Sequence, residues 1–138
     1  KIPLRNEYIF KLNDLHTREI DIPQKKQSEI FEHYTHLCIQ SFLALKEKPS
    51  VLCCINDICG ITFIRLGKEY GLNFIDDVMI TGFDNLQVSY SDYFKFTTVK
   101  QDFKTLGSTA IQTILDILQG KKSESLYRIP AKLIIRNS

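Results

Sequence analysis

The sequence predicts an α/β fold built on a mostly parallel sheet, and three observations support this class. The hydrophobic period switches repeatedly between two and 3.6 along the 138 residues, as it does in alternating strands and helices. Two short apolar runs, residues 51–55 and 78–81, show no alternation, which is typical of parallel strands covered on both faces. Each run is followed at once by a polar or glycine-containing loop. We therefore expect a three-layer sandwich with helices on both faces of the sheet.

The predicted elements follow from the local hydrophobic period and from their terminating residues. Ser28 and Asp57 are expected to cap helices, Pro49 blocks continuation of the first helix, and Gly71 is the expected left-handed residue after the second. The polar stretch 13–27 reads as a loop. The predicted strands are residues 7–12, 51–55, 78–81, 96–99, 126–129 and 131–136, and the predicted helices are residues 28–45, 58–70 and 102–120.

Composition excludes several classes of function. The chain is 43% hydrophobic and 25% charged with a formal net charge of +2, as in an ordinary globular domain. Its basic and acidic residues are mixed, so it lacks the basic stripe that tracks nucleic-acid phosphates. No apolar run reaches the roughly 20 residues that a membrane helix needs, so we expect no membrane partner. The sequence starts at Lys1 without Met, and we expect it to be a fragment.

The cysteines and histidines favour neither a disulfide framework nor a metal site. Cys53 and Cys54 are neighbours in a predicted strand and must face opposite sides of the sheet. Free thiols favour a reducing compartment, and we expect a cytoplasmic protein. His33 and His36 sit three residues apart on one helical face, and with Cys38 they could be imagined as a zinc site. No Cys-x-x-Cys pair accompanies them, so we expect solvated histidines and no metal or cofactor.

Four sequence words, in their order and spacing, point to a family. They are residues 49–57 (PSVLCCIND), 71–72 (GL), 76–85 (DDVMITGFDN) and 97–103 (TTVKQDF) with Leu106-Gly107. Over residues 46–138 the chain resembles the carboxyl-terminal half of the effector-binding region of LacI/GalR-family transcriptional repressors. The resemblance fades upstream of Pro49.

The resemblance implies a periplasmic-binding-protein-like sensor of type I, in which an effector sits between two lobes. This chain would supply the second lobe, residues 7–99 and 125–138, together with crossover elements. Helix 102–119 would belong to the first lobe in the intact protein. Operator DNA would be bound only by a domain absent from this chain, and the sensor would be a homodimer. A polar small molecule, with a sugar as the expected class, would be the effector.

Three residues are candidates for ligand contact. The resemblance implies that the Asp84 carboxylate accepts ligand hydrogen bonds, that Asn56 lies at the pocket wall, and that Phe103 covers an apolar ligand face. An ionised carboxylate accepts two donors through separate oxygens, which suits a polyol. The alternative for Asp84 is a turn residue that bonds its own backbone. For Asp57 we expect a helix cap in preference to a ligand contact.

The dimer surface is predicted from apolar residues around more than one helix face. Ile61 and Ile64 on helix 58–70, and Tyr90 and Tyr93 in the aromatic stretch that follows Val88, are the candidates. The alternative is that these residues close the core of the chain itself. Helix 102–119 also carries an apolar face, which we expect to pack on a second copy or to fold back onto the sheet.

Two other classes of function share this architecture. An α/β enzyme is disfavoured, because no Gly-x-Ser-x-Gly elbow, phosphate-binding glycine loop or paired nucleophile and base is present. A sugar-binding receptor of a transport system shares the fold and would differ in having a signal peptide. Nucleobases offer the same donors and acceptors as sugars, so the effector class stays open between the two.

Overall fold

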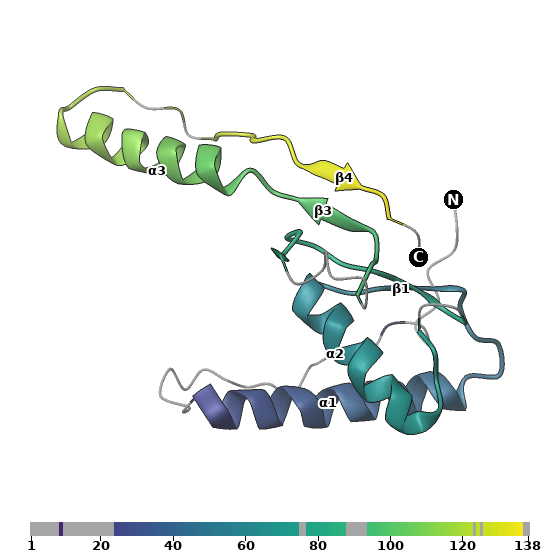
Figure 1. Ribbon diagram of the computed structural model, residues 1–138. Coiled ribbons are helices and arrows are strands. Elements are labelled where there is room, and N and C mark those ends of the chain that lie inside the picture. The colour runs from purple at the N-terminus through teal and green to yellow at the C-terminus, as the bar shows by residue number, and fades with distance from the viewer. Residues whose placement is uncertain are drawn as a thin grey trace.

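The computed structural model describes residue 9 and residues 24–74, 77–87, 94–122, 124 and 126–136. Of the predicted first strand, residues 7–12, only residue 9 is among these residues, and most of the predicted loop 13–27 lies outside them. Among the described helices, none has the length and apolar character needed to cross a membrane. The elements, in chain order, are α1 (Gln24–Ala44), β1 (Val51–Cys53), α2 (Asp57–Gly67), the 3₁₀ turn η2 (Lys68–Tyr70), β2 (Met79–Thr81), β3 (Thr98–Lys100), α3 (Phe103–Leu118) and β4 (Lys132–Ile134). Figure 1 shows their arrangement and labels all of them except η2 and β2.

The parallel pairing predicted for the two apolar runs is confirmed. β1 and β2 pair in parallel, with Leu52 opposite Ile80, and the backbone N–H of Cys54 extends the ladder to the carbonyl of Thr81 at 2.8 Å. Thr81 also forms a parallel bridge to Thr97, so β2 lies between β1 and the segment that enters β3. α2 connects β1 to β2, as the crossover helix of a parallel pair must. The carboxyl ends of these strands therefore share one edge.

The core lies where α1 and α2 meet each other and the sheet. Phe74, 1% exposed, packs against Phe42 of α1 and Phe63 of α2 with ring centroids 5.7 and 6.0 Å apart. A side chain at Gly67 would place its Cβ within 2.2 Å of the Phe74 ring, so the glycine permits the close approach. Ile80 of β2 is 1% exposed and joins the same cluster. The aromatic cluster fixes the two helices relative to β2.

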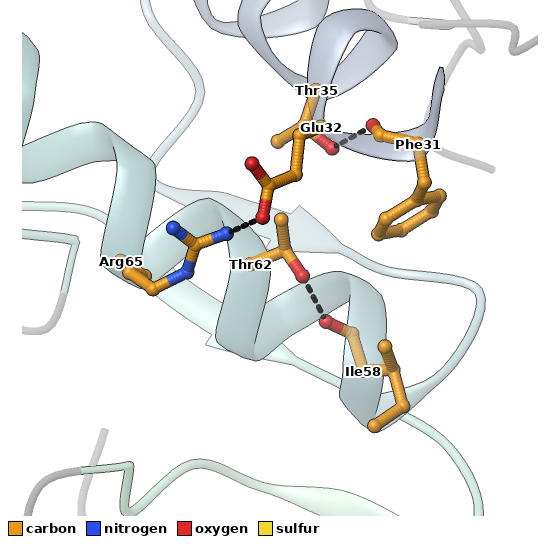
Figure 2. Close-up of polar contacts among 6 residues, drawn as sticks. All are labelled: Phe31, Glu32, Thr35, Ile58, Thr62 and Arg65. Carbon is orange, nitrogen blue, oxygen red and sulfur yellow. Dashed lines mark hydrogen bonds and ion pairs between the residues drawn. The ribbon is translucent and has the colours of Figure 1, made fainter. Parts of the chain in front are cut away.

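Figure 2 shows a polar contact between the two helices and two hydrogen bonds within them. Arg65 of α2 donates to the carboxylate of Glu32 of α1, and both side chains are substantially exposed. The hydroxyls of Thr35 and Thr62 each donate to the carbonyl four residues earlier, which satisfies them where they are buried. A surface ion pair of this kind contributes about 1 kcal/mol or less, so the aromatic core dominates the packing.

A second unit of structure projects from this layer. β3 and β4 pair antiparallel, with Thr98 opposite Ile134 and Lys100 opposite Lys132. Between them the chain forms α3, which Figure 1 shows standing away from α1 and α2. None of the residues of α3 is buried, although its sequence is strongly apolar; Leu106, Ile111, Ile114, Leu115, Ile117 and Leu118 are all 45–77% exposed.

Several predicted boundaries need correction. Ser28 does not cap α1, because the helix already begins at Gln24 and includes residues predicted as loop. The expectation that helix 102–119 folds back onto the sheet is wrong, since α3 is uncovered along its length. Among the described residues of 126–129 no strand forms; only Lys132–Ile134 pairs. The prediction of Gly71 as the left-handed end of the second helix is confirmed, at φ 71°.

Candidate functional site

The loop after β1 begins with the residue that caps α2. Asn56 has extended backbone geometry, and its side-chain Oδ1 accepts from the backbone N–H of Cys59 at 2.8 Å. This contact satisfies one of the N–H groups that the first helical turn leaves without a partner. The cap is therefore Asn56 and not Asp57, which corrects the prediction. Asn56 stays partly exposed, and within the described residues its side-chain nitrogen Nδ2 has no partner.

Asp57 has a different role: its carboxylate is fully buried and joins three segments. Oδ1 accepts from the hydroxyl of Thr98 at 2.5 Å, and Oδ2 accepts from the backbone N–H of Leu86 at 2.7 Å. The backbone N–H of Asp57 donates to the carbonyl of Phe83 at 2.8 Å. With both oxygens used inside the chain and 0% exposure, Asp57 has nothing to offer a ligand. It positions the loop that follows β2.

That loop, residues 82–86, has restricted geometry. A Cβ on Gly82 would lie 2.3 Å from Oδ1 of Asp57 and 2.7 Å from the ring of Phe96, so only glycine fits without displacement. Asp84 and Asn85 both have positive φ, 99° and 54°. Asp and Asn tolerate this left-handed region better than other residues with a side chain. The loop thus turns sharply and presents Asp84 at the edge of the sheet.

The Asp84 carboxylate is partly exposed, and one of its two oxygens accepts a hydrogen bond within the chain. Its Oδ1 accepts from Nε2 of Gln101 at 2.7 Å, and its backbone N–H donates to the carbonyl of Val99 at 2.9 Å. Within the described residues, Oδ2 has no hydrogen-bond partner. An accessible carboxylate oxygen with no internal donor is available to accept from a ligand hydroxyl or N–H.

Phe103 follows directly on the segment that holds this carboxylate. Asp102 caps α3 by accepting from the backbone N–H of Thr105 at 3.0 Å, which makes Phe103 the first helical residue. Gln101, which holds Asp84, is only two positions before Phe103. The Phe103 ring is 54% exposed and is available for an apolar contact. The loops after β1 and β2 and the start of α3 are thereby linked through Asp57, Asp84 and Gln101.

The thiols near β1 are free and not arranged for metal binding. The hydrogen bond between the Cys54 and Cys59 side chains, followed by burial, raises the pKa of Cys54 above its ordinary value. The same hydrogen bond lowers the pKa of Cys59, against the effect of burial. His36 contacts the Tyr70 hydroxyl through Nδ1 at 2.9 Å. No group of three potential metal ligands occurs among the described residues, and all four cysteines are free.

The predicted dimer residues divide into three cases. Ile64 is 2% exposed inside the hydrophobic core, so it cannot form an interface, and that prediction is wrong. Ile61 is partly buried and packs against the same core, which leaves part of it accessible. Tyr90 and Tyr93 lie outside the described residues.

Sequence reasoning missed three residues of this region: Gln101, Thr98 and Arg136. Gln101 and Thr98 belong to a word that carries the family resemblance, but no role was assigned to either. A threonine at an inward position of a buried strand is a usable signal, because its hydroxyl must find a partner there. Arg136 donates to Oδ1 of Asn85 at 2.6 Å and to the carbonyl of Phe96 at 3.1 Å. Nothing local in the sequence indicates that contact across 51 residues.

Comparisons with known proteins identify the family and the fold of the chain. The family model of the periplasmic binding protein-like domain matches residues 11–138. The HTH-type transcriptional repressor PurR of Photobacterium profundum is 30% identical over 100 residues, which cover 70% of this chain and 29% of that protein. The lactose operon repressor of Escherichia coli (strain K12) is 29% identical over 90 residues, covering 65% and 25%.

A solved structure shows the same relationship in three dimensions. The lac repressor dimer bound to operator and the anti-inducer ONPF superposes with a TM-score of 0.64 and 27% identity, over 75% of this chain and 36% of that chain. The predicted α/β fold of the periplasmic-binding-protein-like type is therefore confirmed. The chain spans less than a third of the length of the curated relatives named above, both of which are transcriptional repressors.

Proposed function

The chain belongs to the periplasmic binding protein-like domain family, and we propose that it is the effector-sensing part of a transcriptional repressor. The observation that carries the proposal is the Asp84 carboxylate, which stands partly exposed at the carboxyl edge of the parallel strands. Ligands of open α/β sheets bind at this edge. The named relatives are repressors, and their names supply the regulatory class. We expect the protein to act in the cytoplasm and not as an enzyme.

The ligand chemistry follows from what Asp84 has left to offer. Gln101 occupies Oδ1, so Oδ2 is the acceptor for one ligand donor, unless the ligand displaces the glutamine. Asn56 contributes its Nδ2 as a donor, since Oδ1 is used by the helix cap. Phe103 adds an exposed aromatic face. A sugar matches this set, because each ring carries hydroxyls that donate and accept beside an apolar face of C–H groups.

A nucleobase is the second candidate effector. One acceptor on Asp84 and one donor on Asn56 also match the N–H and carbonyl of a heterocyclic lactam, and an aromatic ring such as Phe103 can stack on its face. The two candidates differ in what the phenyl ring contributes: stacking on a planar base in one case, covering a sugar face in the other. They are separable by the compounds that bind.

The second half of the ligand cleft would come from a first lobe that α3 joins. The large apolar side chains of α3 are 45–77% exposed, although helices of this character are normally covered. In a protein of the relatives' length, the first lobe would cover this face. The homodimer expected for the repressor would use the accessible part of Ile61, and operator DNA would be bound by another domain.

A thermal-shift screen of the full-length protein tests the proposal. The panel consists of lactose, galactose, cellobiose and ribose as sugars, and guanine, hypoxanthine and adenine as bases. The proposal predicts that at least one compound raises the melting temperature in a concentration-dependent manner, because a ligand that binds only the folded state stabilises it. A sugar hit supports the first candidate and a base hit the second. Absence of any shift with either class counts against the sensor function.

A further inference from the structure

One short loop forms hydrogen bonds with both the segment that leads to α3 and the segment that returns from it. We call the antiparallel pair β3 and β4 the ribbon; it carries the chain out to α3 and returns it. The loop of residues 82–86 contacts both strands of the ribbon or their immediate extensions. A rotation of α3 relative to the sheet would therefore strain or break these contacts.

Asp84 holds the outgoing strand. Its backbone N–H donates to the carbonyl of Val99 in β3, and its carboxylate accepts from Gln101 just beyond β3. The backbone N–H of Gly82 adds a bond to the carbonyl of Thr97 at 2.9 Å. The residue proposed to bind effector is thus also the residue that fixes the end of β3.

Asn85 holds the returning strand. Its Oδ1 accepts from Nη2 of Arg136, which lies two residues after β4, at 2.6 Å. The other guanidinium nitrogen of Arg136 donates to the carbonyl of Phe96 at 3.1 Å. The Thr97 hydroxyl donates to the Arg136 carbonyl and accepts from its N–H, both at 3.2 Å. Arg136 therefore connects Asn85 to the beginning of the outgoing segment as well.

The contacts of Asp84 with the outgoing strand and of Asn85 with the returning strand are connected, because these two residues are consecutive and both have positive φ. They share one planar peptide, so a change in the backbone torsion angles of Asp84 also moves the backbone that carries the Asn85 side chain. A residue with a side chain has few other conformations with positive φ, so small adjustments at this pair are restricted.

We propose that the Asn85–Arg136 contact is a positioning contact that transmits occupancy of Asp84 to the ribbon and so to α3. The inference rests on the proposed function, and neither Asn85 nor Arg136 is assigned a contact with the effector. A ligand that draws the Asp84 carboxylate toward itself moves the shared peptide, and Arg136 passes this movement to the end of β4. Loss of the contact should uncouple ligand binding from ribbon geometry without abolishing binding.

Matched variants at position 85 test the proposal in the full-length protein. Asn85→Gly keeps the left-handed backbone and removes the acceptor, whereas Asn85→Asp keeps both backbone tolerance and an acceptor for Arg136. The probe is the compound from the thermal-shift panel that stabilises the wild type most. Calorimetry gives its Kd, and amide hydrogen exchange with and without the probe reports on residues 98–101 and 132–136.

The expected result separates binding from transmission. Coupling between sites typically amounts to about 5- to 150-fold, so the probe should change ribbon exchange at least about fivefold in wild type and in Asn85→Asp. In Asn85→Gly that change should disappear while the Kd stays within about threefold. Arg136→Met should reproduce the loss, and the double variant should add nothing further. A merely structural role would lower the stability of Asn85→Gly and Arg136→Met without removing the ligand-dependent change.

Two outcomes would overturn the inference, and they are distinguishable from each other. If the wild type binds the probe and Asn85→Gly retains the full ligand-dependent change in exchange, the transmission claim fails while the sensor function stands. If no panel compound binds the wild type, the proposed function fails and takes the ligand-coupled claim with it. Hydrogen exchange in the ligand-free proteins then shows whether Asn85 holds the ribbon. If the Asn85–Arg136 contact stabilises the ribbon, residues 132–136 should exchange faster in Asn85→Gly than in the wild type.

Discussion

The side-chain nitrogen of Gln101 donates to Oδ1 of Asp84 over 2.7 Å, which holds the end of β3 against the loop that follows β2. A residue just before α3 thus takes one of the two carboxylate oxygens that a ligand would use. The ligand must either share Asp84 with Gln101 or displace it. The proposed site therefore shares a hydrogen bond with the segment that leads to α3.

Asp57 should be a stability residue and not a binding residue. Asp57→Ala removes the acceptor of the buried Thr98 hydroxyl and of the partly buried Leu86 N–H, and we expect a loss of about 2–4 kcal/mol in the free energy of unfolding. Urea unfolding followed by circular dichroism measures it. Asp77→Ala removes an exposed carboxylate and should cost under about 1 kcal/mol. Equal effects in the two variants would contradict the buried network.

Two glycine substitutions should have opposite signs. A Cβ at Gly82 would lie 2.3 Å from Oδ1 of Asp57, so Gly82→Ala should displace the loop and destabilise the fold by about 1–3 kcal/mol. Gly107 lies inside α3, and a Cβ there would meet nothing within 4 Å. Gly107→Ala should therefore stabilise the helix by about 0.5–1 kcal/mol. Helicity and melting temperature check both, and a harmless Gly82→Ala would refute the steric argument.

The stability of the first turn of α3 should decrease at acid pH. Hydrogen bonds from the Thr105 backbone N–H and hydroxyl hold the pKa of Asp102 below its ordinary value. A carboxyl group whose pKa is depressed on folding contributes stability above its unfolded pKa, about 4, and loses that contribution as pH falls through the folded value. The protection factor of the Thr105 amide against hydrogen exchange should fall below about pH 4. Asp102→Asn should remove this pH dependence, and an unchanged profile would contradict the assignment.

The apolar face of α3 should matter only when a first lobe is present. Ile114 is 58% exposed, so in the 138-residue chain Ile114→Gln should change the free energy of unfolding by under about 0.5 kcal/mol. In full-length protein the same change should cost about 1.5–3 kcal/mol, if the lobe covers this face. Ile80→Ala, in the core, is the control and should cost about 2–5 kcal/mol in both proteins. Equal small effects of Ile114→Gln in both would place α3 outside the first lobe.

The sequence was sufficient for elements whose signals are local. The two unalternating apolar runs predicted the parallel pair β1 and β2, and Gly71 marked the end of the helical segment because its φ is positive. The start of α1 was mispredicted because Gln24 to Gln27 are polar and were read as a loop. Gln and Lys are nevertheless good helix formers, so polarity alone was a poor guide there.

The candidate site was only partly predictable. Asn56 and Asp57 are both capping residue types, and their order in the chain does not say which one caps. The choice depends on Thr98, which is 41 residues away and whose hydroxyl donates to the Asp57 carboxylate. Asn56 then accepts the hydrogen bond from the first turn of the helix. Local patterns cannot encode such a partner. Likewise, the exposure of α3 reflects what surrounds it and not its own sequence, which is that of a covered helix.

Calorimetry on Asp84 tests the central claim most directly. The full-length protein is titrated with the panel compound that stabilises it most, beside Asp84→Asn and the matched control Asp77→Asn. Asparagine tolerates the left-handed backbone at position 84, so the substitution removes an anionic acceptor with little backbone strain. Asp84→Asn should weaken binding by about 10- to 100-fold, the roughly 1.5–3 kcal/mol of a hydrogen bond to a charged group, while Asp77→Asn leaves it unchanged. Wild-type affinity in Asp84→Asn would contradict the effector site.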